Sequence, residues 1–129
     1  MTLMLDTSGY TAFKLGHEKA VQAIKSAEKM LLPLIAYGEL LAGFEVGSKR
    51  VQNRTELQEF IKSPRVNLAP IVPATAERYA HIYAYLRRAG KPVPTNDLWI
   101  AASAMEHSAE LLTGDAHFSS MPMILVRAI

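Results

Sequence analysis

The chain has 129 residues, 50% of them hydrophobic and 20% charged, which is enough for one domain with a buried core. It has no cysteine, which excludes disulfides, thiolate metal sites and cysteine nucleophiles and fits a cytoplasmic protein. The 14 Lys and Arg residues against 12 Asp and Glu give a net charge of +2, which tolerates an anionic partner without requiring one, and no apolar run is long enough to span a membrane. We therefore expect a single domain over residues 1–129.

The first half of the chain alternates short apolar runs with residues at helical spacing. From the amino terminus we predict a strand at 3–5, a turn at 6–9, a helix at 17–29, a strand at 30–35, and helices at 36–46 and 54–62. Pro33 inside the second strand favours an edge position or an early end, because proline cannot donate to a sheet ladder.

The second half continues this alternation. We predict a weak strand at 66–68, a helix at 75–89, an extended proline-rich loop at 91–94, a helix at 97–107, and strands at 110–113 and 123–126. The helix at 75–89 is expected to turn one stripe toward the core, formed by Ala76, Tyr79, Ala80, Tyr83 and Leu86. Thr95 or Asn96 is expected to cap the next helix. The alternation indicates an α/β fold with a central parallel sheet of four to five strands flanked by α-helices.

Four acidic residues lie where predicted strands end or helices begin. Asp6 follows the first strand, Asp115 follows the strand at 110–113 after one glycine, Asp97 opens a helix, and Glu39 lies near the start of another. In an open parallel sheet, the loops at the carboxyl ends of the strands build the site. We therefore expect the four carboxylates to meet at one edge of the sheet.

Carboxylates held that close repel one another and must bind protons or a cation. A site of oxygen donors suits Mg²⁺ or Mn²⁺, and such a site suits the hydrolysis of phosphodiester bonds. Each acid taken singly also has a structural interpretation, because Asp is common in turns and helix caps. Glu39 lies nearly opposite the apolar stripe of its helix, where a glutamate is usually solvated.

The segments around these acids resemble the four acidic motifs of PIN-domain ribonucleases, especially the toxins of VapBC-type toxin–antitoxin modules. The matching segments, in family order, are Leu5-Asp6-Thr7-Ser8, Tyr37-Gly38-Glu39-Leu40-Leu41-Ala42-Gly43, Asn96-Asp97-Leu98-Trp99-Ile100-Ala101-Ala102 and Leu112-Thr113-Gly114-Asp115-Ala116-His117-Phe118.

The resemblance implies a PIN fold in which Asp6, Glu39, Asp97 and Asp115 are the catalytic, metal-binding quartet. It also implies an endoribonuclease that depends on Mg²⁺ or Mn²⁺ and forms a homodimer. A cognate antitoxin would inhibit it, and operator DNA would be contacted only through that antitoxin. We expect Asp6 and either Asp97 or Asp115 to ligate the metal directly, with Glu39 and the remaining Asp binding through water or orienting the nucleophile.

Polar residues beside the acids are candidates for orienting them. Thr7, Ser8, Asn96 and Thr113 can donate hydrogen bonds to the carboxylates, although caps and turns would use the same residue types; we favour Thr113 and Asn96. His117, two residues beyond Asp115, is close enough to contact a phosphate, whereas most loop histidines are simply exposed.

Two basic clusters are candidates for binding RNA phosphates. The first follows the helix at 36–46 and contains Lys49, Arg50 and Arg54. The second leads into the proline-rich loop and contains Arg87, Arg88 and Lys91. A solvated helix face is the plain alternative, more so for the first cluster than for the second.

The alternative function is a small signalling module of the receiver type, whose acidic pocket binds Mg²⁺ and accepts a phosphoryl group. The length, the parallel sheet and the strand-end aspartates fit this class. However, receivers carry adjacent acidic residues after the first strand, whereas Asp6 is followed by Thr7-Ser8. They also need an Asp at the end of the middle strand, where this chain has Asn67-Leu68-Ala69.

Overall fold

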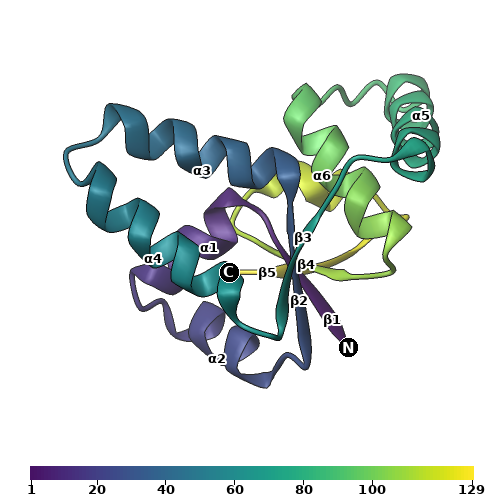
Figure 1. Ribbon diagram of the computed structural model, residues 1–129. Coiled ribbons are helices and arrows are strands. Elements are labelled where there is room, and N and C mark those ends of the chain that lie inside the picture. Colours follow the sequence, from purple (N-terminus) through teal and green to yellow (C-terminus); the bar gives the residue numbers. More distant parts are fainter.

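The computed structural model describes residues 1–129 and consists of one sheet with helices packed around it (Figure 1). The strands are β1 (Thr2–Leu5), β2 (Lys29–Pro33), β3 (Val66–Ala69), β4 (Glu110–Thr113) and β5 (Leu125–Ala128). The helices are α1 (Thr7–Lys14), α2 (Glu18–Ser26), α3 (Leu34–Val46), α4 (Arg50–Lys62), α5 (Pro73–Arg88), α6 (Thr95–Glu106) and the short 3-10 helix η1 (Ala116–Ser120). No helix combines the length and the apolar character that crossing a membrane requires.

All five strands are parallel, and their order across the sheet is β3-β2-β1-β4-β5. The chain builds outward from β1 through β2 to β3, and then crosses to β4 and β5 on the other side. The point of reversal therefore lies between β1 and β4, which is where open α/β sheets place their ligand sites. This confirms the predicted α/β fold. The order differs from the 2-1-3-4-5 of receiver domains, so the receiver alternative is not favoured.

The core lies on both faces of the central strands. Met4 and Leu5 of β1 and Leu111 and Leu112 of β4 are completely buried. In Figure 1, α1 to α4 gather on the left of the strands and α5 and α6 on the right. Burial on both faces explains why these strands are continuous apolar runs in the sequence.

The predicted turn at 6–9 is wrong, because residues 7–14 form the helix α1. Asp6 is its N-cap, and its side chain accepts a hydrogen bond from the Gly9 backbone N–H. Gly9 is buried against β4, where an added Cβ would lie 2.3 Å from the Leu112 carbonyl oxygen. Turn-forming residues are also good residues for a helix start, and here the cap and the packing favour the helix.

The predicted core stripe of α5 is also wrong in part. Thr75, Ile82 and Leu86 are buried, whereas Ala76 and Ala80 are exposed and Tyr83 is 45% exposed. Tyr79 is half-buried and its ring stacks on Trp99 of α6 with a centroid separation of 4.2 Å.

Several predicted boundaries move by a few residues. Pro33 is the last residue of β2, which is an interior strand, so the early end is right and the edge position is wrong. Helix α4 begins at Arg50 and therefore includes residues expected to precede it. Helix α6 begins at Thr95 after Pro94, and its start has no side-chain cap, contrary to the expectation for Thr95 or Asn96.

Candidate functional site

The four predicted acids line one depression of about 280 Å³, called here the acidic depression. Asp6 follows β1, Asp115 follows β4 and caps η1, Asp97 lies in the first turn of α6, and Glu39 lies in α3. The remaining lining residues are Thr7, Ser8, Thr11 and Ile100. No Lys or Arg is among the residues that line it, so four carboxylates share this space with no Lys or Arg among them.

Asp6 is the most deeply buried of these acids, with 4% of its surface exposed. Its Oδ1 accepts hydrogen bonds from the Gly9 N–H and the Ser8 hydroxyl, both at 2.7 Å. Its Oδ2 accepts a hydrogen bond from the Thr113 hydroxyl. Burial raises the pKa of Asp6, the three hydrogen bonds oppose this, and the charge of Asp115 raises the pKa further.

The same polar residues link the ends of β1 and β4. The Ser8 hydroxyl accepts a hydrogen bond from the Gly114 N–H at 2.9 Å, and the Thr113 hydroxyl accepts one from the Asp115 N–H at 2.9 Å. Each hydroxyl thus accepts a hydrogen bond from a backbone N–H of the loop after β4 and donates a hydrogen bond to the Asp6 carboxylate. This fixes Asp6 relative to the backbone that carries Asp115.

Glu39 is held by donors from two other helices. The Thr7 hydroxyl of α1 donates to Oε1 at 2.8 Å, and the Asn96 side-chain amide of α6 donates to Oε2 at 3.1 Å. Glu39 is therefore half-buried and oriented into the acidic depression, contrary to the solvated position that its helical wheel suggests.

His117 of η1 bridges two of the acids. Its Nδ1 lies 2.8 Å from Asp97 Oδ2 and 3.1 Å from Asp115 Oδ1. Burial raises the pKa of Asp97; the hydrogen bond from His117 lowers it, and the charges of Asp115 and Glu39 raise it. The hydrogen bond to Asp97 and the charge of Asp115 raise the pKa of His117.

This donor set fits a divalent cation. The carboxylates lie close enough for Asp115 to raise the pKa of both Asp6 and Asp97, so a cation among them would relieve repulsion. Asp97, Asp115 and His117 can each offer one ligand atom with all three atoms within 4.8 Å of one another. The carboxylate oxygens of this set suit Mg²⁺ and Mn²⁺.

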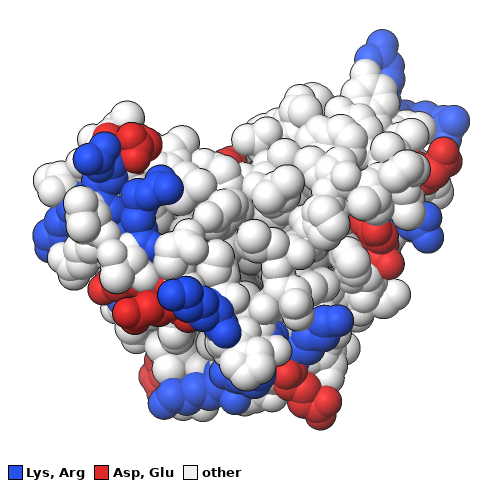
Figure 2. Space-filling view, viewed as in Figure 1, with Lys and Arg blue, Asp and Glu red and all other residues white.

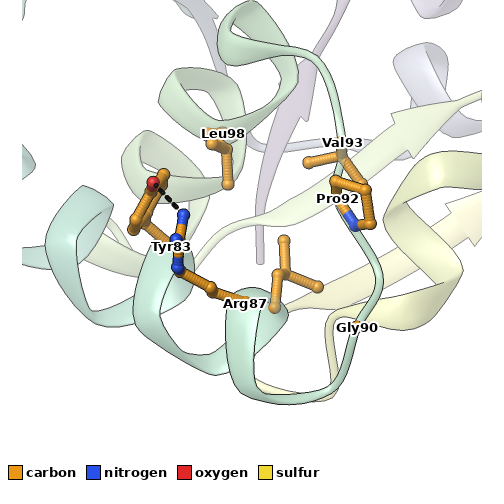
Figure 3. A pocket seen from close by; sticks show the side chains of 7 residues that line it. Tyr83, Arg87, Gly90, Pro92, Val93 and Leu98 are labelled. Carbon is orange, nitrogen blue, oxygen red and sulfur yellow. Dashed lines mark hydrogen bonds between the residues drawn. The ribbon is translucent and has the colours of Figure 1, made fainter.

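The basic candidates are not among the residues that line the acidic depression. Figure 2 shows Lys and Arg side chains over α3 and α4 on the left and over α5 on the right, among other places. Arg87 lines a separate pocket of about 260 Å³ with Tyr83, Pro92, Val93 and Leu98, and its guanidinium donates to the Tyr83 hydroxyl at 3.2 Å (Figure 3). Leu98 follows Asp97 directly, so the first turn of α6 separates this pocket from the acidic depression.

The remaining basic candidates are exposed. Arg88 ends α5, and Lys91 lies in the loop that leads to α6. Lys49 precedes α4 and Arg50 is its first residue, and Arg50 pairs with Glu45 of α3 at 3.5 Å.

Three of the site's interactions escape prediction from the sequence. The Gly9 backbone donor exists only because residues 7–14 are helical; an Asp directly before small polar residues is the signal for such a cap. The double role of the Ser8 hydroxyl depends on the pairing of β1 with β4. The sequence suggests a phosphate contact for His117, whereas the structure shows its ring between Asp97 and Asp115.

Comparison with known proteins shows the family. A family profile described as PIN domain matches residues 3–123. Ribonuclease VapC4 of Mycobacterium tuberculosis is 32% identical over 96 residues, which are 74% of this chain and 74% of that protein. The solved structure of VapBC2 from Rickettsia felis, bound to a DNA fragment from its promoter, matches with a TM-score of 0.87 at 22% identity over 100% of this chain and 99% of that chain. The DNA-bound VapBC from Salmonella typhimurium matches with a TM-score of 0.86 at 24% identity over 99% of this chain and 98% of that chain. These two structures support the fold, and the profile together with the ribonuclease relative shows the family: the chain belongs to the PIN-domain family, in its VapC group.

Proposed function

We propose that this protein is a metal-dependent endoribonuclease that acts as the toxin of a VapBC-type toxin–antitoxin pair in the cytoplasm. The observation that carries the proposal is the acidic depression, where four carboxylates from the ends of β1 and β4 and from α3 and α6 line one space without a Lys or Arg. The name of the relative from M. tuberculosis, a ribonuclease, supports the choice of RNA as substrate.

Asp6, Asp97 and Asp115 are the residues that would hold Mg²⁺ or Mn²⁺, with Glu39 bound directly or through water. The ion, when bound, supplies an activated water for attack on phosphorus and offsets charge on the phosphate and the leaving oxygen. Each carboxylate must therefore stay ionised and aimed into the depression.

The neighbouring polar residues perform that orientation. Thr113 fixes Asp6 through its hydroxyl and positions the Asp115 backbone through the same oxygen. Thr7 and Asn96 each hold one oxygen of Glu39. A carboxylate held by such donors keeps its lone pairs directed toward the ion, which is how supporting contacts raise metal affinity.

RNA binding is assigned to the basic residues at the end of α5 and at the start of α4. Arg87, Arg88 and Lys91 flank the loop that leads to Asp97, and Lys49 and Arg50 form a second basic group. The full assembly contains a second copy of this chain and a cognate antitoxin, and it contacts operator DNA through the antitoxin alone.

The test is cleavage of a total RNA pool with Mg²⁺ or Mn²⁺ and with EDTA, with the fragment ends mapped. Asp6→Asn and Asp97→Asn are expected to lower the cleavage rate at least about a hundredfold while circular dichroism shows a folded protein. Glu77→Gln, which removes an exposed carboxylate on α5, is the matched control and should cleave like the wild type.

Cleavage that survives EDTA, or full activity in both aspartate variants, would overturn the proposed mechanism. The toxin assignment is tested in cells: expression of the chain should arrest growth, and co-expression of its cognate antitoxin should restore it. Arrest by the Asp97→Asn variant would show that growth inhibition does not depend on the proposed site.

A further inference from the structure

We propose that His117 is itself a metal ligand, through Nδ1, and that this nitrogen makes the site favour Mn²⁺ over Mg²⁺. The inference rests on the proposed function in one respect, which is that a divalent ion binds the acidic depression. It goes beyond the four acids, because it adds a fifth side chain of different donor chemistry.

The distances around Nδ1, which in the metal-free protein are those of a hydrogen bond to Asp97 and an ion pair with Asp115, also match the spacing of donors that share one ion. Nδ1 lies 2.8 Å from Asp97 Oδ2 and 3.1 Å from Asp115 Oδ1. Donors on adjacent corners of an octahedron, each about 2.1 Å from the ion, lie about 3 Å apart. The two carboxylates come from different elements, α6 and the cap of η1, and converge on this one nitrogen.

The turn that carries His117 is anchored on both sides. Asp115 caps η1 by accepting the His117 backbone N–H at 2.9 Å, and the Ser120 hydroxyl donates to the His117 carbonyl at 2.9 Å. Phe118 and Met121 are buried, with 1% and 2% of their surface exposed. The backbone of His117 is therefore fixed in place, although half of its side-chain surface is open to solvent.

A nitrogen ligand changes which ion the site prefers. Mg²⁺ binds oxygen donors and keeps several waters, whereas a transition-metal ion accepts imidazole more readily. Coordination releases any proton on Nδ1 to solvent and leaves the neutral ring with its proton on Nε2. If His117 only forms ion pairs with Asp97 and Asp115 and does not coordinate the ion, it competes with the ion for these carboxylates. Removal of His117 would then strengthen metal binding.

The experiment uses the full chain loaded with Mn²⁺ and records the electron spin-echo envelope modulation of the bound ion. Wild-type protein should show nitrogen hyperfine coupling from a directly bound imidazole. His117→Ala should lose that coupling while it still binds Mn²⁺ through the carboxylates. His81→Ala, which removes an exposed histidine of α5, is the matched control and should keep the coupling.

Affinities for both ions are measured on the same proteins. His117→Ala should weaken Mn²⁺ binding by at least about tenfold and change Mg²⁺ binding much less, so the preference for Mn²⁺ shrinks. Absence of nitrogen coupling in the wild type, or tighter Mn²⁺ binding by His117→Ala, would overturn the inference. Those results leave the proposed function intact as long as Asp97→Asn abolishes metal binding and RNA cleavage. A wild-type protein that binds neither ion would contradict the proposed function itself.

Discussion

The Thr113 hydroxyl donates a hydrogen bond to the Asp6 carboxylate across a sequence separation of 107 residues. It also accepts the Asp115 backbone N–H at 2.9 Å, so one buried oxygen sets the relative position of two acids. The contact exists because β1 pairs with β4, with Leu5 in register with Leu112 directly before these residues. The sheet itself thus determines the separation of the carboxylates.

Thr113→Val keeps the shape of this side chain and removes its hydroxyl. Asp6 loses one donor and the Asp115 N–H loses its acceptor, so we expect a loss of about 1–3 kcal/mol in the free energy of unfolding. Metal affinity should fall about 10- to 100-fold, as it does when the support of a ligand is removed. Urea unfolding in EDTA and titration with Mn²⁺ measure the two effects.

Thr55→Val is the control for this substitution. Thr55 is exposed on α4, and its hydroxyl donates only to the Val51 carbonyl at 2.9 Å. Its stability should change by less than about 0.5 kcal/mol, with no change in metal affinity. Wild-type metal affinity in Thr113→Val would show that the hydroxyl does not orient Asp6.

Gly9→Ala tests the close contact between α1 and β4. The new Cβ would lie 2.3 Å from the Leu112 carbonyl oxygen and 3.4 Å from Asp6 Oδ1, and backbone cannot rotate away as a side chain can. We expect destabilisation of about 1–3 kcal/mol or more, together with weaker metal binding. Gly43→Ala in α3, with no atom within 4 Å, should instead stabilise by about 0.5–1 kcal/mol. Thermal unfolding measures the stability of both variants, and equal stability of Gly9→Ala and Gly43→Ala would contradict the packing argument.

The sequence predicts the strands because each contains a short apolar run, and it predicts the approximate place of two of the acids because β1 and β4 are each followed by an aspartate. Asp6 and Asp115 follow β1 and β4, and the rule for parallel sheets brings such positions together. Helix α1 is different, since Thr7, Ser8 and Gly9 have weak helical propensity. Its helical state depends on the Asp6 cap and on the packing of Gly9 against β4, which are tertiary effects.

Tertiary neighbours also explain why the helical spacing predicts the wrong position for two side chains, those of Glu39 and Tyr83. A helical wheel gives the direction of a residue relative to its own helix and says nothing of the neighbours. Glu39 lies away from the apolar stripe of α3, yet Thr7 and Asn96 from two other helices stand on that side. In α5 the predicted core face includes Leu86, which is buried, but its other buried apolar residue is Ile82 and not Tyr83, which is exposed.

Because the pKa of Asp97 is raised in the folded protein, the stability of the metal-free protein should fall as the pH rises through that pKa. The folded protein holds this proton more tightly than the unfolded chain, whose ordinary pKa is 3.8, because of burial and the charges of Asp115 and Glu39. Asp97 therefore contributes stability that is complete below pH 3.8 and is lost as the pH rises through the raised pKa. Relative to Asp97→Asn, the metal-free wild type should lose stability over this range.

Urea unfolding of both proteins in EDTA, from about pH 3.5 to about pH 6, measures the difference. The range stays below the ordinary histidine pKa of 6.5, and the hydrogen bond to Asp97 and the charge of Asp115 raise the pKa of His117 in the folded wild type, so most of the titration of His117 lies above this range. Excess Mn²⁺ at neutral pH should then stabilise the wild type by about 2.7 kcal/mol at a hundred times its Kd, and leave Asp97→Asn nearly unchanged. A constant difference between the two proteins across the range would contradict the raised pKa.

RNA binding should depend on salt through the basic residues beside the acidic depression. The double variant Arg88→Ala and Lys91→Ala removes two exposed charges at the start of the connection that leads into α6 and Asp97. The slope of log affinity against log salt should therefore fall by about 0.7 for each phosphate that these side chains neutralise. Lys25→Ala with Lys29→Ala is the matched control, because it removes the same charge where α2 ends and β2 begins, at the opposite edge of the sheet. Lys49→Ala with Arg50→Ala should act less strongly, since Glu45 already pairs with Arg50. Fluorescence anisotropy with a random-sequence single-stranded RNA in EDTA measures all three, and equal slopes would place the RNA elsewhere on the surface.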